Sequence, residues 1–133
     1  MKSRAFFTKM MADRNVSDVC FATNIRSNQI YDWLKGRNRI YPQSARKLAQ
    51  YFRVGPENFL EEWYEIDPAD HSFGAEIKRR RLRMGFSLMD LSHKLGYADK
   101  TICNWEHNQL RENKHDEIRK LFESVESDFL KMF

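Results

Sequence analysis

The chain has 133 residues, a typical length for one medium-sized domain or two small ones. Its hydrophobic fraction of 41% is ordinary for a folded protein, and glycine and proline are scarce, which favours a packed helical protein over a disordered one. The formal net charge of +4 lies entirely in residues 1–66, with 11 Lys and Arg against 7 Asp and Glu, whereas residues 67–133 carry 12 of each. Many helical proteins carry a net charge of this size as solvated surface, so the placement of the cations, and not their number, indicates whether an anionic partner is expected.

Short helices are predicted throughout the first half, over residues 4–14, 16–25, 27–36, 42–52 and 55–66. Ser17 is a plausible N-cap for the second of these helices, Gly36 ends the third, and Pro42 suits the first position of the fourth. The fourth helix places four apolar residues on one face: Ala45, Leu48, Ala49 and Phe52. No stretch alternates with the period of a strand, so the sequence predicts an all-α protein.

Residues 67–74, "DPADHSFG", combine Pro, Asp, Ser and Gly and are predicted to form a linker. Further helices are predicted beyond it, over residues 75–86, 87–97, 99–108 and 112–133. Ser87 is a good N-cap for the second of these, and Gly96 ends it. The first is expected to turn Ile77 and Leu82 inward and four arginines mainly outward: Arg79, Arg80, Arg81 and Arg83. These arginines either approach a phosphate or balance the acidic residues of the last helix.

The two halves repeat the same pattern. Three pairs of core-type residues are separated by 72 positions: Val19 and Leu91, Ile30 and Ile102, and Trp33 and Trp105. A constant offset through a helix, a turn and a second helix indicates a tandem duplication of a small five-helix unit. The sequence therefore predicts a first domain at 1–66, a linker at 67–74 and a second domain at 75–133.

The segment "IRSNQIYDWLKGRNR", Ile25–Arg39, predicts a helix with a narrow apolar stripe. Ile30 and Trp33 lie one helical turn apart and are expected to hold the helix to its own domain. Polar residues remain on the outside, where amides and arginine hydrogen-bond to base edges in the major groove of DNA: Arg26, Ser27, Asn28, Gln29 and Asp32. Three cations follow where phosphates would run: Lys35, Arg37 and Arg39. Two helices joined by a tight turn, with such an outer face, are typical of helix-turn-helix proteins.

The segments "SNQIYDWLKGR" and "DKTICNWEHNQ" resemble the lambda-repressor-like, or XRE-type, helix-turn-helix family, and the resemblance covers most of the chain twice. The second copy is the better match, because "LSHKLGYADKTICNWE" keeps the leucine, the glycine and the Trp-Glu ending of the family pattern. The first copy departs from it at Thr23, Asn24 and Leu34, which stand where leucine, glycine and glutamate are usual. Val16 and Leu88 replace the glutamine that touches a phosphate at the start of the first motif helix in the family.

The resemblance implies two tandem five-helix lambda-repressor-like domains and extends the candidate DNA contacts to the second copy. Its candidate base contacts are Asp99, Lys100, Thr101 and Asn104, and its candidate phosphate contacts are His107 and Arg111. Asp99 has two readings: its carboxylate accepts a hydrogen bond from a cytosine amino group, or it caps its own helix.

Other kinds of site have little support in the sequence. The four histidines do not cluster with carboxylates or thiols at ligand spacing, so no metal or other cofactor is expected. Without a catalytic constellation or a glycine-rich phosphate loop, an enzyme is not expected either. Cys20 and Cys103 are expected as reduced thiols in a cytoplasmic protein, and no run of about 18 apolar residues predicts a membrane span.

The expected function is that of a sequence-specific, double-stranded DNA-binding transcriptional regulator. The competing hypothesis is a protein-interaction module, such as an antitoxin-like or antirepressor protein, that grips a protein partner with the same helices. The tandem chain either reads an asymmetric site alone or forms a homodimer on an inverted repeat. The C-terminal tail is a further candidate surface for a protein partner, through Phe129, Leu130, Met132 and Phe133.

Overall fold

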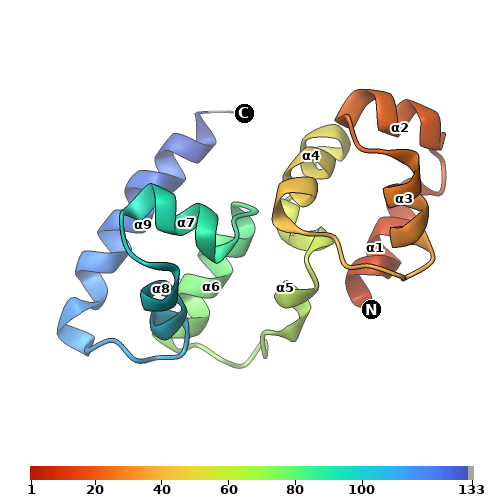
Figure 1. The fold of residues 1–133 in the computed structure, drawn as a ribbon. Coiled ribbons are helices and arrows are strands. Elements are labelled where there is room, and N and C mark those ends of the chain that lie inside the picture. The colour runs from red at the N-terminus through yellow and green to blue at the C-terminus, as the bar shows by residue number, and fades with distance from the viewer. Residues whose placement is uncertain (132–133) are drawn as a thin grey trace. The chain divides into compact units, whose positions relative to one another are not determined.

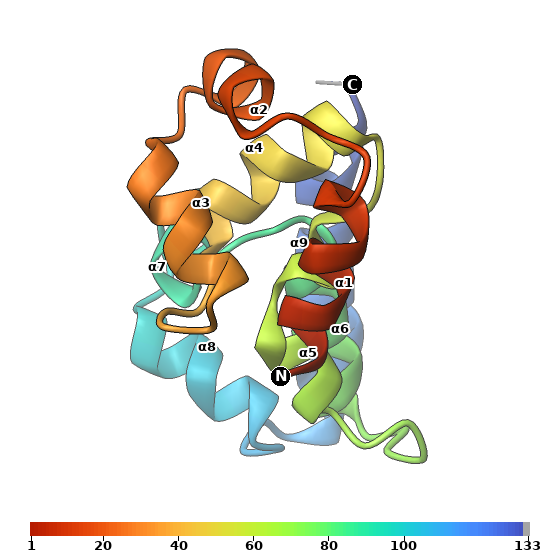
Figure 2. The same ribbon diagram turned by 90° about the vertical axis from the view of Figure 1, so that its right-hand side faces the viewer.

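A computed structural model of the chain describes residues 1–131, and these residues form helices and connecting loops without any strand (Figures 1 and 2). The prediction of an all-α protein is therefore confirmed. Within this described range, no helix combines the length and apolar character needed to cross a membrane. The chain divides into two compact units, Met1–Glu65 and Ile66–Phe133.

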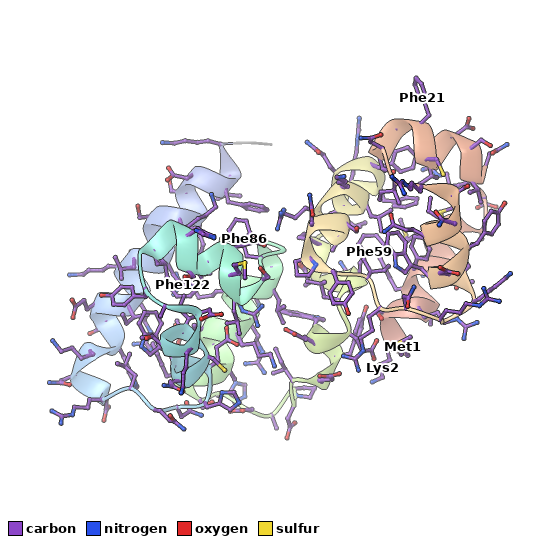
Figure 3. All side chains as sticks on the ribbon, in the orientation of Figure 1. Met1, Lys2, Phe21, Phe59, Phe86 and Phe122 are labelled. Carbon is purple, nitrogen blue, oxygen red and sulfur yellow. The ribbon has the colours of Figure 1, made fainter. Side chains whose placement is uncertain are left out.

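Unit 1 contains five α-helices and one 3-10 helix among the described residues: α1 (Lys2–Met11), α2 (Val16–Thr23), α3 (Ser27–Leu34), α4 (Pro42–Phe52), η1 (Pro56–Phe59) and α5 (Glu61–Glu65). Its core is aromatic. Phe7 of α1 meets Trp33 of α3 edge-on at 5.7 Å between ring centroids, and it meets Phe59 of η1, labelled in Figure 3, at 6.2 Å. The face of α4 predicted to be apolar is buried, with Leu48 fully enclosed. Through its contact with Phe7, Trp33 packs α3 against α1, the first helix of the unit.

Unit 2 contains α6 (Phe73–Arg83), α7 (Leu88–Leu95), α8 (Asp99–Glu106), η2 (Glu112–Lys114) and α9 (His115–Leu130). Its core includes Leu91, Ile102, Trp105 and Phe122, the last of which is labelled in Figure 3. Within the described residues this unit has four α-helices rather than five, because α9, with 16 residues, occupies the end of the chain where unit 1 has α4 and then α5. The helix α6 begins at Phe73, inside the stretch predicted as linker.

The helix bounds repeat along the chain as the core residues do. The bounds of α7 are those of α2 shifted by 72 positions, and the bounds of α8 are those of α3 shifted by the same number. All six residues of the paired core set are buried: Val19, Leu91, Ile30, Ile102, Trp33 and Trp105. The two helix pairs therefore share their bounds and their buried positions at a constant offset.

Three local expectations need correction. The N-cap of α2 is Asn15, whose side chain accepts a hydrogen bond from the Ser17 amide at 2.8 Å, so Ser17 lies inside the helix. In the C-terminal tail, Phe129 is only half exposed, because its ring packs edge-on against Phe86 at 6.0 Å. Leu130 is exposed as expected, while Met132 and Phe133 lie outside the described residues.

The expected outward direction is also wrong for Arg81, which is only 3% exposed. Its Nε donates to the Glu106 carboxylate at 2.7 Å, and its Nη1 donates to the Phe86 carbonyl at 2.9 Å. The pair joins α6 to the end of α8, where Glu106 is equally enclosed. Lys9 and Leu34 occupy the equivalent positions in unit 1. These two residues cannot form an ion pair, so α3 is not held to α1 as α8 is held to α6.

The neighbouring arginines also make contacts within unit 2. Arg80 binds Glu126 of α9 through its Nε at 3.1 Å, which supports the reading in which the basic run balances acids of the last helix. Arg119 of α9 donates in turn to Glu76 of α6, with its Nε 2.8 Å from one carboxylate oxygen. The hydrogen bond from Arg119 holds the pKa of Glu76 below its ordinary value of 4.5.

We expect Arg81→Met to destabilise unit 2 by about 3 kcal/mol, because it leaves the enclosed Glu106 carboxylate without its cation. Lys9→Met, at the equivalent exposed position of unit 1, should change stability by less than about 0.5 kcal/mol. Adding Glu106→Leu to Arg81→Met should recover part of the loss, since the unpaired charge is then removed. Native-state hydrogen exchange of amides in α6–α9 measures these changes separately from unit 1. Equal stability of the wild type and Arg81→Met would contradict the prediction.

Glu76→Gln should lower the melting temperature at pH 7, with a difference that disappears in acid. The pKa of Glu76 is depressed in the folded chain, so its stabilising effect is present above pH 4.5 and is lost as pH falls through the lower, folded value. Circular dichroism melts between pH 7 and pH 3 measure the difference. Glu123→Gln, an exposed substitution on α9, is the control and should show no comparable pH-dependent difference.

Candidate nucleic-acid interface

The turn between α2 and α3 depends on one residue with left-handed backbone geometry. The helix α2 ends at Thr23, whose buried hydroxyl donates to the Val19 carbonyl at 2.6 Å. Asn24 follows with φ 57°, a conformation that asparagine tolerates better than most residues. Ile25 is then buried at 4% exposure, and α3 begins two residues later. The departure from glycine at this position therefore still permits a short turn, as Gly96 does in unit 2 with φ 78°.

The helix α3 has one buried side and one exposed side. Ile30 is fully enclosed and Trp33 is 5% exposed, so these two residues fix the rotation of the helix about its own axis. The candidate base-contact residues at the start of the helix are all exposed: Arg26, Ser27, Asn28 and Gln29. The structure thus leaves in water the four polar side chains that the sequence singled out at the start of α3.

Asp32 differs from these four residues because it is half-buried and paired. Its carboxylate lies 3.5 Å from Nη1 of Arg37, and its carbonyl accepts the Arg37 amide at 2.9 Å. A carboxylate held by a neighbouring cation is less available to accept from a base. Asp32 therefore orients the Arg37 side chain, and it is also a candidate base contact.

The loop after α3 carries the three cations that were expected to meet phosphates (Figure 2). Lys35, Arg37 and Arg39 are all exposed, and Arg39 lies 3.2 Å from the carboxylate of Glu65. Exposed ion pairs such as Arg39 with Glu65 contribute little free energy, so a phosphate can replace the carboxylate at small cost. Two of the three cations are therefore partly compensated within unit 1, and Lys35 has no ion pair among the described residues.

Sequence reasoning missed Tyr31 on this surface. The side chain of Tyr31 is 48% exposed, three residues after Asn28 and four before Lys35, a spacing that places the three residues on one side of the helix. The spacing of Asn28, Tyr31 and Lys35 is the signal in the sequence that indicates this shared side.

In unit 2, α7 and α8 form the equivalent surface. The helix α7 begins with a capping box. The Ser87 side chain accepts a hydrogen bond from the Asp90 amide, and the Asp90 side chain accepts one from the Ser87 amide. Ile102 and Trp105 bury one side of α8. Of the predicted base contacts, Asp99 and Lys100 are exposed, whereas Thr101 and Asn104 are only half exposed.

Asp99 is not the N-cap of α8, because that position belongs to Ala98. The Asp99 carboxylate accepts a hydrogen bond from the adjacent Lys100 amide at 2.8 Å, so it does satisfy one donor of the first turn. Among the predicted phosphate contacts, Arg111 is exposed, and His107 is exposed with its Nδ1 2.7 Å from the Cys103 carbonyl.

The two surfaces differ in charge. Residues 16–41 contain four Lys and Arg and two Asp and Glu, whereas the equivalent residues 88–113 contain three and four. One of those four acids, Glu106, is neutralised internally by Arg81. The surface of unit 1 is therefore the better match for a polyanion such as DNA.

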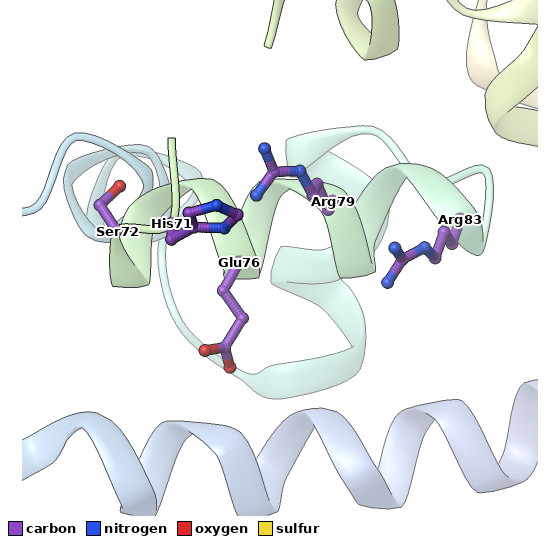
Figure 4. A pocket seen from close by; sticks show the side chains of 5 residues that line it. All are labelled: His71, Ser72, Glu76, Arg79 and Arg83. Carbon is purple, nitrogen blue, oxygen red and sulfur yellow. The ribbon is translucent and has the colours of Figure 1, made fainter. Parts of the chain in front are cut away.

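A separate hollow of about 270 Å³ lies along α6, lined by His71, Ser72, Glu76, Arg79 and Arg83 (Figure 4). Figure 4 shows Glu76 pointing away from Arg79, toward α9, where Arg119 binds it. Arg79 donates to the carbonyls of Asp70 and Asp67 at 2.7 and 3.0 Å. The polar groups of this hollow thus serve the fold of unit 2. Among residues 1–131, no three His, Cys, Asp or Glu side chains gather as a metal site would require, and both cysteines are free thiols.

Comparisons of this chain with protein family models, with curated proteins and with solved structures found no match.

Proposed function

We propose that the chain is a sequence-specific, double-stranded DNA-binding transcriptional regulator of the lambda-repressor-like type, acting in the cytoplasm. In this proposal α2 and α3 form one helix-turn-helix and α7 and α8 form a second, and α3 lies in the major groove. The observation that carries the proposal is the exposed part of α3, where Asn28 stands opposite the buried Ile30 and Trp33 and Gln29 is also exposed.

The chemistry of this surface suits both parts of DNA recognition. Asn28 and Gln29 are exposed side chains of the type that pairs bidentately with adenine in the major groove, and Arg26 is of the type that pairs with guanine. Lys35 and the two loop arginines supply cations for the phosphates beside the groove. In this proposal α3 contacts the DNA bases, and the cations at its end and in the following loop contact the DNA phosphates.

The differences between the two units favour an asymmetric site. At four equivalent candidate base-contact positions the side chains differ: Ser27 and Asp99, Asn28 and Lys100, Gln29 and Thr101, and Asp32 and Asn104. Two helices with different outer residues read different base sequences, so a single chain engaging both would select two unlike half-sites. If unit 1 alone reads bases, a homodimer on an inverted repeat is expected instead. The sequence of the selected DNA distinguishes the two arrangements.

The second candidate function is that of a protein-interaction module, such as an antitoxin-like or antirepressor protein. One observation favours it: Phe21 projects from α2 and is 93% exposed (Figure 3). A large apolar side chain so fully in water gains free energy when a protein partner covers it. The exposed Leu130 near the end of α9 is a second apolar residue that such a partner could cover.

Binding to DNA should weaken by about 40-fold between 50 and 200 mM salt if Lys35, Arg37 and Arg39 each neutralise one phosphate, because each neutralised phosphate releases condensed counterions. Fluorescence anisotropy with a labelled duplex, recovered by selection from random sequences, measures the dependence. A loss below about threefold would contradict phosphate contacts by this surface. Failure to recover or shift any duplex at low salt would overturn the proposed function.

Asn28→Ala and Gln29→Ala should each cost about 1–3 kcal/mol on the selected duplex and almost nothing on a scrambled one, since base contacts carry the sequence information. Arg37→Ala and Arg39→Ala should weaken binding to both duplexes alike. Lys100→Ala, the position equivalent to Asn28 in unit 2, tests whether α8 also reads bases. Equal losses on both duplexes for the Asn28 and Gln29 variants would exclude α3 from base reading.

A further inference from the structure

Tyr31 stands out on the outer side of α3 because it is aromatic among amides and cations. It shares this side with Asn28 and Lys35 and lies opposite the residues that bury the helix, Ile30 and Trp33. With 48% of its surface exposed, the ring is available to a partner lying along the helix.

The fold does not use this ring as it uses other tyrosines of unit 1. Tyr51 meets the Phe52 ring edge-on at 4.8 Å, and the Tyr64 hydroxyl donates to the Asn58 carbonyl at 2.8 Å. Within residues 1–131, Tyr31 has no hydrogen bond from its hydroxyl and no ring contact of this kind. Its side chain is therefore free to serve binding rather than packing.

The major groove offers one apolar group to such a ring. Among the four bases, only thymine carries a methyl group on its major-groove edge, and apolar side chains recognise thymine by contact with that methyl. A tyrosine ring is apolar over most of its surface, while its hydroxyl can remain in water or reach a phosphate. On a helix whose outer side enters the groove, Tyr31 is thus suited to a methyl group where Asn28 is suited to a hydrogen-bonding edge.

We propose that Tyr31 is a specificity-determining residue of unit 1 and that its ring contacts the 5-methyl group of a thymine in the bound duplex. This inference rests on the proposed DNA-binding function. Cys103 occupies the equivalent position of α8, with a half-buried side chain whose Sγ lies 3.6 Å from Nδ1 of His107. The shorter side chain does not provide a ring, so the half-site read by unit 2 lacks this methyl contact.

The test replaces each thymine of the selected duplex, one at a time, by deoxyuridine, which lacks only the methyl group. For the wild-type protein, one replacement should weaken binding by about fourfold, the change expected for one buried methyl group. Tyr31→Ala should bind the thymine and deoxyuridine duplexes equally, whereas Tyr31→Phe, which keeps the ring, should retain the fourfold difference. Phe21→Ala removes an exposed aromatic residue from α2 and should also retain it.

Two results would overturn the inference while leaving DNA binding intact. Either the wild type tolerates every deoxyuridine replacement, or Tyr31→Ala keeps the full discrimination. If the wild type enriches no duplex at all, the proposed function and this inference fail together. Retained discrimination in Tyr31→Ala with loss in Phe21→Ala would instead place the methyl contact on α2.

Discussion

The burial of Ile30 and Trp33 is the constraint on which the candidate interface depends. Trp33 packs edge-on against Phe7 of α1, so α3 cannot rotate about its axis without opening the core of unit 1. Fixing that rotation determines which side chains remain in water. Asn28, Tyr31 and Lys35 are exposed because they stand on the other side of the same helix. The core contacts of α3 and its candidate binding surface therefore lie on opposite sides of one helix.

Both units bury an isoleucine and a tryptophan of the second helix, Ile30 and Trp33 in α3 and Ile102 and Trp105 in α8, but the contacts around these residues differ. Helix bounds and buried positions recur after 72 residues, but only unit 2 adds the enclosed pair of Arg81 and Glu106. An enclosed ion pair fixes the position of α8 at the cost of desolvating two charges, whereas Leu34 of unit 1 requires no such compensation. The three paired core positions hold similar apolar residues in both units, whereas the outer residues of α3 and α8 differ, since a core must keep its volume and a surface only its solubility.

Electrostatics distinguish the units more clearly than their folds do. The cations that follow α3 are exposed; Arg39 pairs with the exposed Glu65 carboxylate, which a phosphate can displace, and Arg37 pairs with the half-buried Asp32. In unit 2 most arginines of the basic run bind groups of their own unit, including Glu106, Glu126 and the carbonyls of the loop before α6. A run of arginines is therefore a poor guide to an anion-binding surface until their partners are known.

The sequence by itself determined the all-α class, the positions of most helices, and the polar outer side of α3, because helix periodicity and terminal residues are local properties. It could not determine that Arg81 turns inward, that Phe129 packs against Phe86, or that Arg39 meets Glu65. Those contacts join residues 25 or more positions apart, and nothing in the local pattern indicates which distant side chain lies opposite. The sequence also left open whether the basic run meets a phosphate or the acids of the last helix; for Arg80 tertiary packing decided this, since it places Glu126 of α9 beside the guanidinium.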